Sequence, residues 1–438
     1  MRPKILLIVI LLLALPAHAA LKIQSWTLAN GARVLFVETH AVPIIDINVE
    51  FDAGTRRDPP GKSGLASLTN ASLSAGLRAG AEAALSEAQI SDTIADTGAQ
   101  RSDEVASDTA GMNLRTLSAL AERTPAIALL GRLIAEPAFP EEFFVRDKAR
   151  SIAALKEALT KPEVLAGRAL QRMMYGAHPY AREETPESLA ALTRADLQTF
   201  HAAHYVANHA IVSMIGDMSR AEADAIAQEV TRRLKQGAAL PALPLVAPAQ
   251  AAEETIAHPA SQSHILLGQP AVVRGEADYF PLIVGNYVLG GGGFVSRLMR
   301  EVRELRGLAY SVDSGFTPLA QAGPFEISLQ TSREQTVEAL KLVRATLAAF
   351  LRDGATAQEL KGAKDHMIGG FSLRIDNNRK ILANIAAIGF YNLPLDYLDT
   401  WTAKVAAVTQ ADIQAAFRRK VALDRMATVV VGGVAVSP

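Results

Sequence analysis

The sequence predicts an α+β protein built from two homologous α/β sandwich domains joined by a linker. Three observations lead to this prediction: one stretch of sequence occurs twice, strand-like segments are followed by long helical ones in both copies, and a proline-rich segment separates the copies. We expect the two domains to cover residues 20–236 and 260–438, with the linker at 237–259.

The repeat is visible without gaps. The segment LTRADLQTFHAAHYVANHAIVSMIGD, from Leu192, aligns with VTQADIQAAFRRKVALDRMATVVVGG, from Val408, so that Asp196 falls on Asp412 at an offset of 216 residues. The same offset places Asn70 on Asn286 and Gly76 on Gly292. Because the offset holds in two well-separated places, we infer a duplication.

Strands and helices follow the same order in both halves. Period-two alternation predicts strands at 44–51 and 325–330, and Ala/Leu-rich stretches predict helices at 146–159 and 336–352. Each half closes with a helix that leads into a β-rich run, at 210–215 and at 427–431. The linker, GAALPALPLVAPAQAAEETIAHP, has four prolines and neither period, so we expect it to be extended and the halves to be separate domains.

Composition excludes several classes of function. With 44 basic and 45 acidic residues the net charge is −1, which gives no basic excess for binding a nucleic-acid backbone. Cysteine is absent, which excludes disulfides, thiolate zinc sites, Fe–S clusters and cysteine nucleophiles. Any metal would have to be held by His, Asp or Glu.

The N-terminus has the three parts of a secretory signal peptide. Arg2 and Lys4 precede an apolar run from Ile5 to Leu15, and the small-residue pattern Ala17-His18-Ala19 follows. We expect cleavage after Ala19, no membrane span in the remaining chain, and a periplasmic location. Eleven apolar residues are too few to span a bilayer as a helix.

Two motifs are set aside. Gly61-Lys62-Ser63 lacks the glycine that a phosphate-binding loop needs five residues earlier, where Arg56 stands. His201, His204 and His209 are close in sequence, but no carboxylate lies within a turn of them, so we expect surface or helix-end histidines rather than metal ligands.

The most informative stretch is Gly285 to Phe316. We expect a glycine loop at Gly290, Gly291, Gly292 and Gly293 whose backbone can approach a substrate closely, followed by a helix from about 296 to 305. Arg303 and Tyr310 flank the turn at Gly307 and can point to a common surface, where a guanidinium and a phenol could hold a peptide carbonyl or stabilise an oxyanion. The alternative is a solvated basic helix face with a packed tyrosine.

This stretch resembles a known family. The runs Leu289-Gly-Gly-Gly-Gly-Phe-Val-Ser-Arg-Leu and Arg303-Glu-Leu-Arg-Gly-Leu-Ala-Tyr310-Ser resemble the C-terminal signature of the M16 metallopeptidases, the family of pitrilysin and the mitochondrial processing peptidase. The opening Leu28-Ala-Asn-Gly-Ala-Arg-Val34, the stretch Tyr175-Gly-Ala-His-Pro-Tyr180 and the strand end Ile215-Gly-Asp217 are also similar to that family. The resemblance covers essentially the whole chain after the signal peptide.

The resemblance also shows what is missing. Active members carry H-x-x-E-H on a helix, where two histidines bind zinc and the glutamate activates water. The matching positions here are Ser67, Asn70 and Ala71, and the family's third ligand, a glutamate, should fall near Lys148. The resemblance therefore implies no metal and no cofactor in this chain.

The Arg303 and Tyr310 pair is intact. By resemblance to the two-chain members of the family, we expect the zinc-free subunit of a heterodimeric periplasmic metallopeptidase, inactive alone, whose Arg303 and Tyr310 position peptide over the zinc of an H-x-x-E-H-bearing partner. The alternatives are a stand-alone pseudo-peptidase that binds peptides as a chaperone or adaptor, and a structural scaffold subunit. Peptides small enough to be enclosed are the expected substrates.

Overall fold

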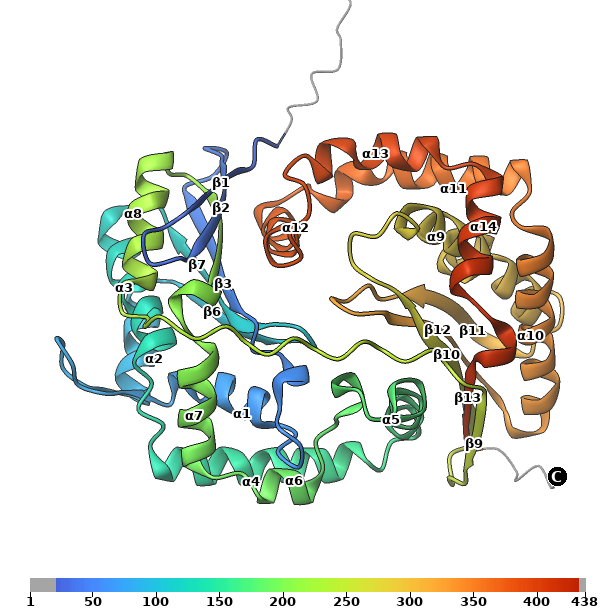
Figure 1. Ribbon diagram of the computed structural model, residues 1–438, viewed down its shortest axis with the longest axis horizontal. Coiled ribbons are helices and arrows are strands. Elements are labelled where there is room, and N and C mark those ends of the chain that lie inside the picture. The colour runs from blue at the N-terminus through green and yellow to red at the C-terminus, as the bar shows by residue number, and fades with distance from the viewer. Residues whose placement is uncertain (1–20, 433–438) are drawn as a thin grey trace, which may run out of the picture.

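The computed structural model describes residues 21–432 and consists of two β-sheets, each with helices packed on it (Figure 1). The predicted signal peptide, 1–19, lies outside the described residues. The fold class predicted from the sequence is confirmed: each half is a sheet with a layer of helices on one face.

The N-terminal sheet has six strands in the order β1-β2-β8-β3-β7-β6. Neighbouring strands are antiparallel except β2 and β8, which run parallel. The strands are β1 (Gln24–Thr27), β2 (Arg33–Glu38), β3 (Ile44–Phe51), β6 (Gln100–Val105), β7 (Ala110–Leu117) and β8 (Ile211–Gly216); β4 (Gly76–Leu77) and β5 (Leu85–Ser86) form a separate short ribbon.

The C-terminal sheet has five strands in the order β11-β12-β10-β13-β9. They are β9 (Ala252–Ile256), β10 (Gln262–Val272), β11 (Ala309–Phe316), β12 (Gly323–Ser332) and β13 (Ala427–Val431). Its parallel pair is β9 with β13, at the place that β2 and β8 occupy in the first sheet. The two sheets therefore share one topology, as a duplication requires.

Strand β9 lies inside the segment where the sequence predicted an extended linker without a strand. Residues 237–251 have no helix or strand, but 252–256 pair with β13 along their whole length. The prediction was wrong for these five residues because alternation over so short a segment is a weak signal, and the pairing with β13 decides its conformation.

Several of the helices also repeat at the offset of the sequence repeat. In the N-terminal half they are α1 (Leu65–Ala71), α2 (Glu87–Asp96), α3 (Leu120–Ala135), α4 (Glu141–Ala158), α5 (Pro162–Tyr175), α6 (Pro186–Ala190), α7 (Arg194–His204) and α8 (Arg220–Thr231). In the C-terminal half they are α9 (Tyr279–Asn286), α10 (Thr336–Asp353), α11 (Ala357–Gly369), α12 (Asn378–Phe390), α13 (Tyr397–Ala407) and α14 (Gln410–Lys420). Helices α7 and α14, from the sequence repeat, begin with equivalent capping boxes in which a threonine and an aspartate satisfy each other's backbone amides.

The two halves exchange one helix each. Helix α5 packs on β10 and β13 of the C-terminal sheet, and its equivalent α12 packs on β2, β3 and β8 of the N-terminal sheet (Figure 1). Leu170 and Met174 contact the C-terminal strands, while Ile385 and Ile388 belong to the same apolar cluster as Leu35. Each sheet is thus covered on one face by its own helices and on the other by a helix of the other half.

A buried carboxylate ties the halves together. Asp108, which is 1% exposed, accepts hydrogen bonds from the phenols of Tyr180 at 2.7 Å and Tyr391 at 2.9 Å and from the amide of Ala320 at 2.8 Å. Arg56 also pairs with it. Ala320 and Tyr391 belong to the C-terminal half, so this one side chain joins both halves.

Strand β3 shows why the sheets have two different faces. Ile45, Ile47, Val49 and Phe51 are fully buried in the helical core of the N-terminal half. The alternating residues 46, 48 and 50 are polar and face α12.

Within residues 21–432, none of the helices combines the length and hydropathy needed to cross a bilayer.

Candidate functional site

Helix α1 carries the positions at which active M16 peptidases hold zinc. It starts at Gly64, whose φ of 97° lies in the left-handed region that favours glycine. The carboxylate of Asp58 accepts from the amides of Gly64 at 2.8 Å and Ala66 at 2.7 Å and so caps the helix. Burial raises the pKa of Asp58 to about 6.

Asn70, at the position of the catalytic glutamate, is fully buried and has a structural role. Its amide group donates to the carbonyl oxygens of Gly111 at 3.1 Å and Glu104 at 3.3 Å. Its carbonyl oxygen accepts from the phenol of Tyr205 at 2.8 Å. The side chain therefore ties α1 to β6, β7 and the end of α7.

Neither flanking position, nor the position expected for the third ligand, offers a zinc ligand. Ser67 is half-buried and Ala71 is exposed. The ammonium of Lys148 donates to the carbonyl oxygens of Leu192 at 3.1 Å and Ala190 at 3.4 Å, at the C-terminal end of α6. In the part of the chain that the structure describes, no three His, Asp or Glu side chains are grouped to hold a metal ion. The described residues at these positions do not fit zinc.

The motifs set aside in the sequence have structural roles. Lys62 of Gly61-Lys62-Ser63 pairs with Asp196 at 2.8 Å. His201 and His204 lie in the last turn of α7, as expected for helix-end histidines, but both are buried rather than on the surface. His201 bonds to the carbonyl oxygen of Ile134 at 2.9 Å and stacks on Tyr205, and burial lowers its pKa to about 4.

Arg303 and Tyr310 lie together, as their spacing on either side of Gly307 predicts. Arg303 is in a helical segment of π type, η7 (Met299–Glu304), and Tyr310 is near the start of β11. The guanidinium carbon of Arg303 is 4.9 Å from the centre of the Tyr310 ring and 4.6 Å from that of Phe294. The guanidinium is thus held against two aromatic rings.

Arg303 differs from the other arginines around it. Three neighbours are paired with carboxylates: Arg297 with Glu359 at 2.6 Å, Arg300 with Glu301 at 3.0 Å and Arg306 with Glu301 at 2.9 Å. Within residues 21–432, Arg303 has no ion pair and no side-chain hydrogen bond. Tyr310 is 82% exposed. The donors of both side chains are available to a ligand.

The glycine run is helical rather than the expected loop. Residues Tyr287–Gly291 form a π-type turn, η5, and Gly293 to Val295 form a short 3₁₀ turn. Gly290 is buried, and a Cβ there would lie 2.6 Å from the amide nitrogen of Ser314 on β11. Because glycine has no side chain, Gly290 can pack closely against Ser314 within the C-terminal half. Gly291 and Gly293 are the exposed members of the run.

Two cavities occupy equivalent places in the two halves. One, of about 330 Å³, lies between α5 and strands β10, β11 and β12, and Tyr310 is among its lining residues. The other, of about 570 Å³, lies between α12 and the equivalent strands β3, β6 and β7. Both lie where a helix of one half covers the sheet of the other.

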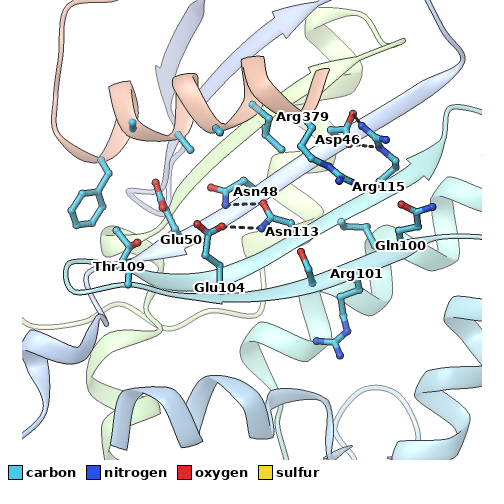
Figure 2. Close-up of a pocket in the computed structure, with 18 of the residues that line it drawn as sticks. Asp46, Asn48, Glu50, Gln100, Arg101, Glu104, Thr109, Asn113, Arg115 and Arg379 are labelled. Carbon is cyan, nitrogen blue, oxygen red and sulfur yellow. Dashed lines mark hydrogen bonds and ion pairs between the residues drawn. The ribbon is translucent and has the colours of Figure 1, made fainter. Parts of the chain in front are cut away.

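The larger cavity is polar on its sheet side, and the sequence analysis did not identify it (Figure 2). Its polar residues include Asp46, Asn48 and Glu50 on β3, Glu104 on β6 and Asn113 on β7. The available signal was three polar residues alternating with apolar ones along a strand. That pattern predicts one polar face but not what covers it.

The comparisons with known proteins agree with the residue pattern. A family model described as the peptidase M16 inactive domain matches residues 191–367. The crystal structure of a peptidase M16 inactive domain from Pseudomonas fluorescens has 36% sequence identity and a TM-score of 0.90, covering 95% of this chain and 99% of that one. The chain belongs to the M16 peptidase family.

This M16 protein is similar to two curated relatives over most of its length. It is 26% identical to the "Uncharacterized zinc protease YmxG" of Bacillus subtilis over 83% of this chain and 87% of that protein. It is also 26% identical to the "Non-peptidase homolog YmxG" of Helicobacter pylori, over 87% of each. Other curated relatives align over only about half of their own length. The chain is an M16 protein of the inactive type, and its resemblance to that family is confirmed.

Proposed function

We propose that this chain is the zinc-free subunit of a heterodimeric M16 peptidase and supplies Arg303 and Tyr310 to the zinc site of an H-x-x-E-H-bearing partner. The observation that carries the proposal is the contrast among the arginines around η7. Three are paired with carboxylates, two of them with the same one, whereas Arg303 is stacked against two rings with its donors unused. Such pre-positioned donors suit a peptide that arrives from outside the chain.

The two side chains have different roles in this proposal. The forked guanidinium of Arg303 holds a backbone carbonyl of the peptide, and its orientation is fixed by Phe294 and Tyr310. The phenol of Tyr310 donates to the carbonyl oxygen on which negative charge develops during hydrolysis. The residues that would hold zinc, and with it the activation of the attacking water, would be supplied by the partner.

An exposed apolar group next to the pair supports an association with another chain. Phe294 is 64% exposed, Val295 72% and Leu305 64%. Exposed large apolar side chains that cluster on a surface are typical of interaction sites. Phe294 stacks on the same guanidinium as Tyr310, so a partner bound at Phe294 would also reach Tyr310.

We further propose residues 20–236 and 260–438 as the two domains, with β9 (Ala252–Ile256) belonging to the second because it pairs with β13. We also propose the periplasm as the location, on the basis of the signal-like segment 1–19. The test of the whole proposal is purification of the tagged chain from its own cell envelope. We expect an M16 chain with H-x-x-E-H to co-purify, with peptidase activity and zinc in the complex only. A chain that purifies alone under all conditions, with no such partner, contradicts the proposal.

Peptide binding without cleavage is the second candidate. The observation that favours it is that both cavities are formed by this chain alone, each between a sheet of one half and a helix of the other. A chaperone or adaptor would bind peptides without any partner. Peptide affinity of the isolated chain, combined with no gain of peptidase activity in any complex, would favour this candidate.

A further inference from the structure

The cavity over the N-terminal sheet contains hydrogen-bond acceptors that have no donor. Glu50 and Asn48 are 9% and 4% exposed, and both line the cavity. One carboxylate oxygen of Glu50 and the side-chain oxygen of Asn48 have no hydrogen-bond partner in the described chain. A buried acceptor without a donor costs about 1–3 kcal/mol, so these oxygens need donors from water or from a ligand in the cavity.

The neighbouring hydrogen bonds run in one direction, toward the carboxylate of Glu104. The amide of Asn48 donates to Asn113 at 3.0 Å, and the amide of Asn113 donates to Glu104 at 3.0 Å. The chain ends at the carboxylate of Glu104, which forms no ion pair among the residues the structure describes. Glu50, Asn48 and Glu104 come from adjacent parts of the same sheet face (Figure 2).

The other end of the cavity has the opposite character. Arg115 is paired with Asp46 at 2.7 Å, whereas Arg379, from α12, has no ion pair within residues 21–432. Figure 2 shows Arg379 beside Asp46 and Arg115. Asp46 and Glu50 are four residues apart on one strand, or about 13 Å. An extended peptide of about four residues has this length.

We propose that this cavity binds the primary ammonium group of a short peptide at Glu50, Asn48 and Glu104. An ammonium has three donors and no acceptor, which matches three acceptors better than an anion or a neutral amide does. Arg379 then meets the carboxylate at the other end of a tetrapeptide. The inference rests on the proposed function only in taking a peptide as the ligand, because the site needs neither Tyr310 nor a partner.

The protonation of Glu50 supports this assignment and gives an independent readout. Burial, together with the nearby charge of Glu104, raises the pKa of Glu50 to about 8, so its carboxyl group is mostly neutral at pH 7 when the cavity is empty. A bound ammonium favours the ionised carboxylate, so binding should release up to about one proton. The other charged residues that line the cavity are Asp46, Arg101, Glu104, Arg115 and Arg379.

Calorimetric titration of the mature chain with tetra-alanine tests the proposal. We expect binding, at least tenfold weaker binding after N-acetylation of the peptide, and at least tenfold weaker binding by Glu50→Gln or Glu104→Gln. Asp92→Asn is the matched control, because it removes an exposed carboxylate of α2 that does not line the cavity. Titrations in buffers of different ionisation enthalpy should show proton release in the wild type and none in Glu50→Gln.

The source of the ammonium is settled by a third peptide, N-acetyl-tetra-alanine with a lysine in place of the last alanine. Binding as tight as that of free tetra-alanine assigns the site to a lysine side chain, and binding as weak as that of the acetylated peptide assigns it to the amino terminus. The proposal is overturned if free and acetylated tetra-alanine bind equally or if neither binds. It is also overturned if Glu104→Gln, a substitution at an exposed residue, leaves the affinity for tetra-alanine unchanged. None of these results depends on the activity of a complex, so they are separate from a failure of the Arg303 and Tyr310 assignment.

Discussion

Asn70 and Tyr205 are joined by a hydrogen bond of 2.8 Å in the core of the N-terminal half, where an active M16 peptidase has its catalytic glutamate. Both side chains are buried, and Asn70 also bonds to two backbone carbonyl groups. The helix that carries the zinc motif in active relatives is therefore retained here as a structural element. Its polar residue now holds helices and strands together instead of activating water.

Removing this bond should destabilise the protein. In Tyr205→Phe the side-chain oxygen of Asn70 loses the hydrogen bond from the Tyr205 phenol. This loss should lower the free energy of unfolding by about 1–3 kcal/mol. Asn70→Glu should cost at least as much, because it introduces a buried acid beside two carbonyl oxygens. Urea denaturation of both variants measures this effect, with the half-buried Ser67→Ala as the control. A free energy of unfolding equal to that of the wild type in Tyr205→Phe would show that this hydrogen bond does not stabilise the protein.

We predict that the mature chain alone binds no stoichiometric zinc. Ser67, Asn70 and Ala71 offer no imidazole or carboxylate, and Lys148 supplies a positive charge where a third ligand is expected. The combined substitution Ser67→His, Asn70→Glu and Ala71→His should also fail to produce a peptidase, because the metal lacks its third protein ligand. Elemental analysis and a peptidase assay of the isolated chain check both statements. One tightly held zinc per wild-type chain, or turnover by the triple variant alone, would refute them.

Asp108 is predicted to be the most sensitive polar position between the two halves. In Asp108→Asn the buried guanidinium of Arg56, which is 4% exposed, loses a charged partner, and the phenols of Tyr180 and Tyr391 lose a strong acceptor. Breaking a buried pair on one side typically costs about 3–5 kcal/mol. Thermal denaturation should show this loss, and the single variant Tyr391→Phe should show a smaller one. Equal stability of Asp108→Asn and the wild type would contradict the role of this carboxylate.

Glu50 should make stability fall as pH rises. Its pKa is about 8 in the folded chain against an ordinary value of 4.5, so between these values the folded state holds a proton that the unfolded state has lost. The contribution is fully present below pH 4.5 and is lost as pH rises through about 8. Glu50→Gln should therefore gain stability relative to the wild type from pH 5 to pH 8. A difference between the two proteins that is constant over this range would contradict the raised pKa.

Much of the fold could be predicted from the sequence because its signals are local. The alternation of Ile44–Phe51 acts within a few residues, and the strand lies where it was expected. The exchange of α5 and α12 could not be predicted, because an amphipathic helix does not specify which sheet it covers. The cavity with Glu50 depends on that exchange and was missed for the same reason. Strand β9 was missed because its pairing with β13 is long-range.

For the candidate site, the spacing of Arg303 and Tyr310 predicted that they lie close together, but not what surrounds the guanidinium. The turn at Gly307 brings Arg303 and Tyr310 together at 4.9 Å. Nothing in the sequence indicated that Phe294 completes the stack or that the neighbouring arginines are all paired. For the glycine run, the sequence suggested an open loop, whereas the packing of Gly290 on Ser314 requires a helical turn.

The measurement that tests the central claim most directly is the steady-state kinetics of Tyr310→Phe in the complex with the H-x-x-E-H-bearing subunit, on a short quenched peptide. Loss of one pre-positioned donor should lower kcat about 10²- to 10³-fold with the complex intact on size exclusion. Arg303→Ala should in addition raise KM. Tyr287→Phe, which removes the phenol of a tyrosine packed on His366 in the same half, should leave both parameters unchanged. Wild-type kcat and KM in assembled Tyr310→Phe and Arg303→Ala complexes would show that the pair only packs, and would contradict the account.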